Sequence, residues 1–170
     1  PGVETSTGSL GHGLGIGAGI ALAGRNDGKQ YRAFVLMGDG EIQEGSVWEA
    51  AMLASRLGLD NLVAIIDANR LQGFDRVDNI QPVETFASKW RAFGWGTAEV
   101  DGHDHRALES VLRRVPFKIG RPSAIIAHTV KGKGISDMED QFESHYLSVP
   151  GEKVDQYLEE LDQGPVSGKQ

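Results

Sequence analysis

A chain of 170 residues with 39% hydrophobic content has the length of about one domain of 100–200 residues and enough apolar residues for a core. The formal net charge of −7, without any run of basic residues, argues against a nucleic-acid-binding protein, and no stretch approaches the roughly 18 apolar residues of a membrane span. The lack of cysteine excludes disulfides, thiolate metal sites and a cysteine nucleophile, and it fits a cytoplasmic protein.

The first unusual segment, residues 8–24, reads GSLGHGLGIGAGIALAG. In a helix, Gly11, Gly15 and Gly19 would form a stripe without side chains, at a cost of about 1 kcal/mol per glycine relative to alanine. We expect such a stripe where another backbone or a flat ligand approaches closely. The segment does not match the G-x-G-x-x-G fingerprint and follows no strand, which argues against a Rossmann dinucleotide site.

Strands and helices are predicted to alternate along the rest of the chain. Strands buried on both faces are predicted at AFVLM (33–37), LVAIID (62–67) and SAIIAHTV (123–130), and a weaker strand at GTAEV (96–100). Helices are predicted at 46–58, 82–94, 105–115 and 152–164. This alternation predicts one α/β domain over residues 1–170, with a mostly parallel sheet flanked by helices.

Two of the helices carry end signals. The helix at 46–58 begins with the capping-box pattern Ser46-x-x-Glu49 and ends at Gly58, which suits a left-handed helix end. The helix at 82–94 has Pro82 for its first turn and Gly94 to close it. Residues 105–115 place their apolar side chains on one face, and 152–164 read as a short amphipathic helix.

The stretch GDGEIQEG (38–45) follows the strand at 33–37 directly. Asp-Gly is a strong turn dipeptide, so an isolated GDG reads first as a turn. The alternative is a ligand site, because ligands of parallel sheets bind outside the carboxyl ends of the strands. Asn69 comes just past the end of the strand at 62–67, and adjacent parallel strands would bring it beside Asp39.

The side chains at these two strand ends suggest a metal-bridged diphosphate. A carboxylate, an amide oxygen and a backbone carbonyl are hard ligands of the kind that Mg²⁺ or Ca²⁺ takes. Gly38 and Gly40 would let main-chain N–H groups approach an anionic ligand. With a single carboxylate, Mg²⁺ would complete its coordination shell with phosphate oxygens of a ligand.

Residues 38–73, GDGEIQEGSVWEAAMLASRLGLDNLVAIIDANRLQG, resemble the thiamine diphosphate motif of the transketolase family. The family's extended pattern GDGE-x-x-EG-x-x-WEA…NL…D-x-N is matched almost position by position. TSTGSLGHGLGIGAGIALA resembles the family's cofactor-contacting Gly-rich helix, and KGKG…SHY its later active-site loop. Deoxyxylulose-phosphate synthase, a relative with GDG but without QEG…WEAA, is less similar. The spelling KGKGISDMED is most like the amino-terminal subunit of split, two-chain transketolases.

The resemblance implies a thiamine diphosphate-binding (PP) domain and a role for each matching residue. The implied ligands of Mg²⁺, or of Ca²⁺ in its place, are Asp39, Asn69 and the backbone carbonyl of Leu71. The implied cofactor contacts are Gly38 and Gly40 at the diphosphate, Gly8, Ser9 and Leu10 along the two rings, and Lys131 and His145 from the later loop. His145 is the implied catalytic residue, near both cofactor and sugar. Glu44 and Glu49 are similar to glutamates that link paired active sites across a dimer interface.

The implied reaction is transfer of a two-carbon ketol unit from a ketose to an aldose sugar phosphate. In this family the glutamate that activates the cofactor lies on a separate pyrimidine-binding domain, and further histidines precede the segment PGVE. Because the chain starts at Pro1 without an initiator methionine, we expect a fragment, a processed chain or one that lacks this N-terminal segment. We therefore expect the diphosphate-binding half of a transketolase, inactive alone, working in an oligomer with a C-terminal, pyrimidine-binding subunit.

Two alternatives remain open at this point. One is a non-catalytic or regulatory module that keeps the fold, and the other is a different enzyme, either a Mg²⁺-dependent phosphate enzyme or another thiamine diphosphate enzyme. The other histidines read as structural: His103 as a turn residue, His105 on a solvated helix face and His128 within a strand. His12 stands where the family usually has Gln, a departure that we expect to leave the fold unchanged.

Overall fold

One parallel sheet organises the molecule, a computed structural model that describes residues 2–162. Its four strands lie in the order β1 (Ala33–Gly38), β2 (Leu62–Ala68), β4 (Ser123–His128) and β3 (Gly96–Asp101). Every neighbouring pair is parallel. The predicted parallel sheet is confirmed, and so is the weaker strand, which forms the edge next to β4.

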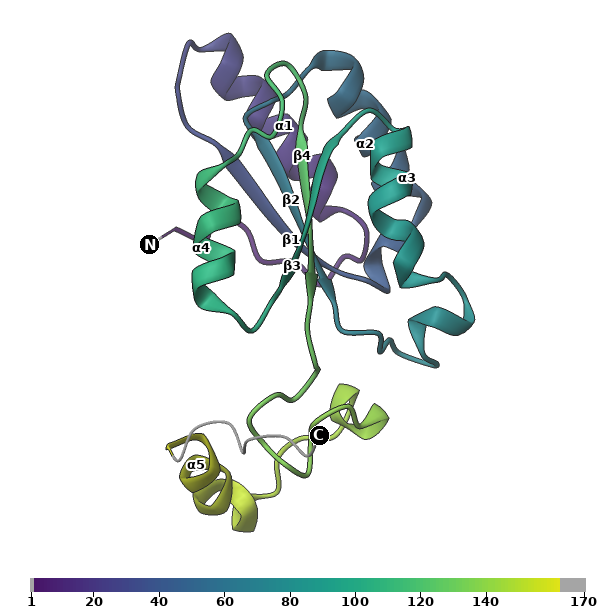
Figure 1. Ribbon diagram of the computed structural model, residues 1–170, viewed down its shortest axis with the longest axis vertical. Helices are drawn as coiled ribbons and strands as arrows, with labels where there is room; N and C mark the ends of the chain where they lie inside the picture. Colours follow the sequence, from purple (N-terminus) through teal and green to yellow (C-terminus); the bar gives the residue numbers. More distant parts are fainter. Residues whose placement is uncertain (1, 163–170) are drawn as a thin grey trace.

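Helices cover the sheet unequally (Figure 1). The helices are α1 (Gly13–Asn26), α2 (Gly45–Leu57), α3 (Phe86–Ala92), α4 (His105–Arg113) and α5 (Val154–Asp162). The larger core joins α1, α2 and α3 to one face of the sheet, whereas α4 packs on the other face through a small cluster around Val63, Val111 and Ile125. The chain after β4, with α5, extends beyond the carboxyl end of the sheet.

Strand β1 is not buried on both faces, so that prediction is wrong. Val35 and Met37 point into the larger core, but Phe34 is 48% and Leu36 70% exposed. The reason is position: β1 is an edge strand, and α4 covers the opposite face only over the far half of the sheet. Composition alone cannot tell an edge strand from a central one.

Several predicted helix ends need correction. Helix α2 begins at Gly45 after Glu44, and no side chain caps it; the hydroxyl of Ser46 instead donates to the carbonyl oxygen of Gly11 at 2.9 Å. Gly58 does close α2 in the left-handed conformation, as predicted, with φ 64°. Residues 82–94 split into a 3₁₀ turn, Val83–Thr85, and α3. The expected ends of the last helix, at 163 and 164, lie outside the described residues.

The glycines of α1 that approach other groups differ from those predicted. Gly15 and Gly19 are exposed, and a Cβ added to either would meet nothing within 4 Å. Gly17 instead faces β1, where an added Cβ would clash with Cγ2 of Val35. Gly11, just before the helix, does need to be glycine, because its φ is 80° and an added Cβ would lie 2.7 Å from Cβ of Glu44. No helix within residues 2–162 is both long and apolar enough to cross a membrane.

These contacts predict opposite effects for two glycine-to-alanine changes in one helix. Gly17→Ala should lower the free energy of unfolding by roughly 1–3 kcal/mol, because Val35 is buried and stiff and must move. Gly15→Ala, the matched control, should raise it by up to about 1 kcal/mol through helix propensity alone. Urea denaturation of the two variants measures both values; equal effects would contradict the close packing of α1 on β1.

Candidate cofactor and metal site

Asp39 is a buried carboxylate at the carboxyl end of β1. Its side chain is almost fully enclosed, with 1% of the residue exposed. Oδ1 accepts a hydrogen bond from the Gly40 N–H at 2.9 Å, and Oδ2 accepts one from the Arg70 N–H at 2.6 Å. Burial raises the pKa of Asp39 to about 6, although these N–H donors act to lower it, and the nearby charge of Asp67 adds to the rise.

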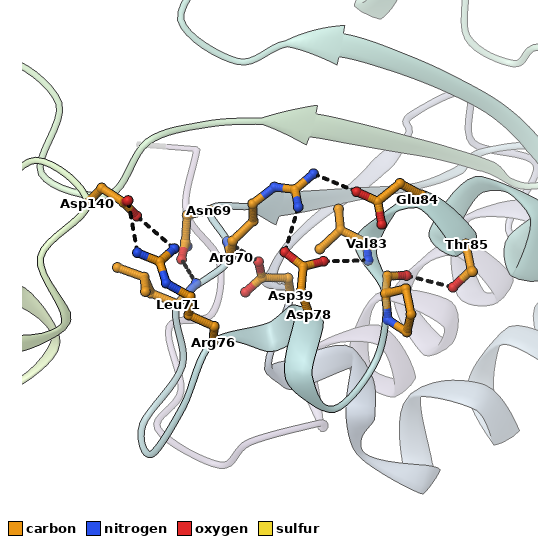
Figure 2. A network of polar contacts seen from close by, with 11 residues as sticks. Asp39, Asn69, Arg70, Leu71, Arg76, Asp78, Val83, Glu84, Thr85 and Asp140 are labelled. Carbon is orange, nitrogen blue, oxygen red and sulfur yellow. Dashed lines mark hydrogen bonds and ion pairs between the residues drawn. The ribbon is translucent and has the colours of Figure 1, made fainter.

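Asn69 lies at the end of the neighbouring strand, as predicted. Gly38 of β1 pairs in register with Asp67 of β2, so the segments that leave the two strands run side by side. The Asn69 amide nitrogen donates to Oδ2 of Asp67 at 2.8 Å, and its Oδ1 accepts the Leu71 N–H at 3.0 Å. The amide oxygen keeps one lone pair for a further partner. Figure 2 shows Asn69 and Leu71 beside Asp39, joined through Arg70.

The donor set fits a hard cation that carries a diphosphate. Within residues 2–162, no three His, Cys, Asp or Glu side chains gather into a metal-binding group. A cation here would therefore depend on Asp39, on the amide oxygen of Asn69, on the Leu71 carbonyl and on oxygens that the ligand supplies, a combination that suits Mg²⁺ or Ca²⁺. The loop after β1 also requires glycine, since a Cβ on Gly40 would lie 2.9 Å from Cβ of Gln72.

The Gly-rich segment before α1 is attached to the same loop. Gly8, Ser9 and Leu10 are exposed and lead directly into Gly11. The Gly11 N–H donates to Oε1 of Glu41 at 3.1 Å, and Ser46 donates to the Gly11 carbonyl. These two contacts place the implied ring-binding segment next to the loop that follows Asp39.

The later loop, residues 129–146, returns to the segment after Asn69. The Tyr146 hydroxyl donates to the carbonyl oxygen of Gly73, and the neighbouring His145 places Nε2 3.9 Å from where a Cβ on Gly73 would lie. An ion pair between Arg76 and Asp140, 2.9 Å from Nη2 to Oδ2, joins the same two loops (Figure 2). His145 therefore reaches the candidate site.

Lys131 opens this later loop, and its side chain is not among the groups that join it to the site. The residue is partly buried, and its carbonyl accepts the Asp140 N–H at 3.0 Å. The predicted structural roles of three other histidines are confirmed. His103 Nε2 accepts the Val130 N–H at 2.8 Å, His105 is exposed at the start of α4, and His128 Nε2 lies 3.0 Å from Oε2 of Glu99 at the end of β4.

Four residues of the site were not singled out from the sequence: Asp67, Arg70, Gln72 and Thr129. Asp67 accepts hydrogen bonds from Asn69 and from the Thr129 hydroxyl at the end of β4, so it fixes the orientation of the Asn69 amide. The amide nitrogen of Gln72 is buried beside Gly40 and has no hydrogen-bond partner among the described residues. A signal was available for Asp67, because polar residues that end buried parallel strands face the ligand edge of the sheet.

The raised pKa of Asp39 predicts a pH-dependent penalty in the ligand-free protein. The folded state holds a proton on Asp39 up to about pH 6, whereas the unfolded chain releases it near 3.8, so this group lowers stability as pH rises through that window. Asp39→Asn cannot ionise. Its free energy of unfolding relative to the wild type should therefore rise between about pH 4 and 6, by up to about 3 kcal/mol, and then stay level. Denaturation at each pH measures this change, and a flat difference would contradict it.

Comparisons with known proteins agree with this geometry. The family model for the transketolase thiamine diphosphate-binding domain matches residues 1–166. One of the two subunits of apulose-4-phosphate transketolase from Phocaeicola vulgatus is 40% identical over 163 residues, which make up 96% of this chain and 58% of that protein. The 6-deoxy-6-sulfo-D-fructose transketolase subunit SqwG of a Clostridium species is 38% identical over 161 residues, 95% of this chain and 58% of that protein.

Solved structures give the same result. Transketolase from Campylobacter jejuni superposes with a TM-score of 0.86 at 28% identity, over 95% of this chain and 26% of that one. The chain thus spans less than two thirds of each of these relatives. From its sequence and its fold together, the chain belongs to the transketolase family, in which it corresponds to the thiamine diphosphate-binding domain.

Proposed function

We propose that this chain is the diphosphate-binding half of a transketolase, which binds thiamine diphosphate through Mg²⁺, or Ca²⁺ in its place, and transfers a two-carbon ketol unit between sugar phosphates. The observation that carries the proposal is the enclosed Asp39 carboxylate beside Asn69, at the carboxyl ends of two paired strands. A buried carboxylate that is held by backbone N–H groups rather than by a cationic side chain gains from a divalent cation.

The chain's own residues would bind and orient the cofactor. Asp39, the Asn69 amide oxygen and the Leu71 carbonyl would hold the cation, while Gly38 and Gly40 would lie against the diphosphate. Gly8, Ser9 and Leu10 would line the two rings, because Gly11 attaches them to the loop after β1. When bound, thiamine diphosphate supplies the nucleophilic carbon for cleavage and formation of the carbon–carbon bond.

The later loop would serve the sugar. His145, next to the segment after Asn69, would hold or move a proton at a sugar oxygen, and Lys131 would add positive charge to the same region. The relatives named above act on different sugars, so membership of the family leaves the sugar of this chain open.

A second chain is part of the proposal. Two relatives that the chain matches over 58% of their length are named as transketolase subunits. The partner that we propose is a C-terminal, pyrimidine-binding subunit, in a homo- or hetero-oligomer. Glu44 and Glu49 are exposed beside the candidate site, which is where an interface with a second active site would need them. We also propose a cytoplasmic location.

Removing either metal ligand should weaken cation-dependent cofactor binding. We expect Asp39→Ala and Asn69→Ala to lower the affinity for thiamine diphosphate in the presence of Mg²⁺ by about tenfold or more. Asp27→Ala, which removes an exposed carboxylate just after α1, is the matched control and should bind as the wild type does. Titration calorimetry with and without Mg²⁺ measures the effect. Unchanged binding by Asp39→Ala would defeat the metal assignment.

Turnover should require both halves of the enzyme. We expect no ketol transfer from this chain alone and activity after the pyrimidine-binding subunit is added. In that mixture, His145→Ala should lower kcat by about 10²–10⁴-fold while cofactor affinity stays unchanged, since the residue acts on the sugar. Assays with each component omitted measure this. Strong ketol transfer by the isolated chain, or metal-dependent turnover without thiamine diphosphate, would contradict the proposal.

A further inference from the structure

Arg70 occupies the position between the two proposed metal ligands Asn69 and Leu71, and its backbone is unusual. Its φ is 67°, in the left-handed region that favours glycine and that long side chains rarely adopt. Within residues 2–162, Asp140 is the only other residue besides glycine with a positive φ. A conformation of this kind persists where surrounding contacts hold it.

The left-handed turn directs two backbone N–H groups at the ligands. The Arg70 N–H donates to Oδ2 of Asp39 at 2.6 Å, and the Leu71 N–H donates to Oδ1 of Asn69 at 3.0 Å. The Arg70 carbonyl accepts the Val77 N–H at 2.9 Å, which closes the hairpin. The turn therefore fixes the carboxylate, the amide and the following peptide relative to one another.

The side chain of Arg70 is anchored outside the family motif. Nη1 lies 2.5 Å from Oδ2 of Asp78, and Nη2 lies 3.0 Å from Oε1 of Glu84. The second oxygen of Asp78 accepts the Val83 N–H at 3.0 Å, which ties this anchor to the turn before α3. Figure 2 shows the guanidinium held between the two carboxylates.

We propose that Arg70 is a positioning residue: its ion pairs with Asp78 and Glu84 hold the left-handed turn that sets the metal ligands in place. The guanidinium is already engaged by two carboxylates, so it acts through the backbone rather than by binding phosphate itself. This inference rests on the metal site proposed above. It assigns part of the cation affinity to two carboxylates that do not touch the cation.

Arg76 provides a matched control within the same hairpin. It bridges to Leu71 across the hairpin and pairs with Asp140, as Arg70 pairs with Asp78. Its φ of −69° is ordinary, so its ion pair holds no left-handed turn. Arg76→Ala removes a comparable charge and a comparable exposed ion pair.

The first experiment measures Mn²⁺ affinity in the presence of thiamine diphosphate, from the loss of the electron paramagnetic resonance signal of free Mn²⁺. We expect Arg70→Ala to weaken Mn²⁺ binding about 10–100-fold. Arg70→Gly should recover part of that loss because glycine adopts the turn unaided, and Arg76→Ala should stay within about twofold of the wild type. Wild-type affinity in Arg70→Ala, or equal losses in both arginine-to-alanine variants, would overturn the inference.

The second experiment needs no bound metal. In the double variant Asp78→Asn, Glu84→Gln, which leaves Arg70 itself in place, backbone hydrogen exchange at Arg70 and Leu71 should become at least about tenfold faster. Arg76→Ala should leave it unchanged, and unchanged exchange in the double variant overturns the inference. Asp39→Ala separates the two proposals: if it loses Mn²⁺ binding and Arg70→Ala does not, the positioning role is wrong and the metal site stands. If Asp39→Ala binds normally, the metal site itself is wrong.

Discussion

The parallel pairing of β1 with β2 is the constraint on which the site depends. Gly38 opposite Asp67 sets where both strands end, and the backbone of Asp39 continues the ladder with an N–H bond of 3.2 Å to the Asp67 carbonyl. Because side chains alternate along a strand, a shift of one residue would turn Asp67 away from Asn69 and Thr129. The register therefore decides whether the two polar loops meet.

Burial of Asp39 sets the electrostatics of the site. The enclosure of the carboxylate raises its pKa to about 6, so its charge costs stability when nothing compensates it. Asp67 adds a second negative group from the central strand. Two backbone N–H donors stabilise the charge only in part, and a divalent cation would complete the compensation. An arrangement that lowers the stability of the empty protein is the one expected to bind a cation well.

Polar contacts, rather than a shared core, assemble the loops around this charge. Gly11 joins the N-terminal segment to the loop after β1, through Glu41 and Ser46. Tyr146 and the Arg76–Asp140 pair join the later loop to the hairpin after β2. Such half-exposed contacts hold geometry at a small net gain in stability, so changes there should affect binding more than folding.

The sequence by itself determined what depends on neighbouring residues. Apolar runs fixed the strands and the parallel sheet, Gly58 its helix end, and the spacing of Asp39 and Asn69 their place at adjacent strand ends. The resemblance to transketolases, carried by contiguous motifs, was confirmed for family and fold.

Only the tertiary structure decided which side chains find which partners. It left Leu36 of the edge strand exposed, turned Ser46 from a helix cap to the Gly11 carbonyl, and gave the close approach to Gly17. It also anchored Arg70 on Asp78 and Glu84, a contact that no local pattern specifies. The physical reason is that strand order and loop packing bring together residues distant in the chain, and a hydrogen bond forms with whichever donor lies within reach.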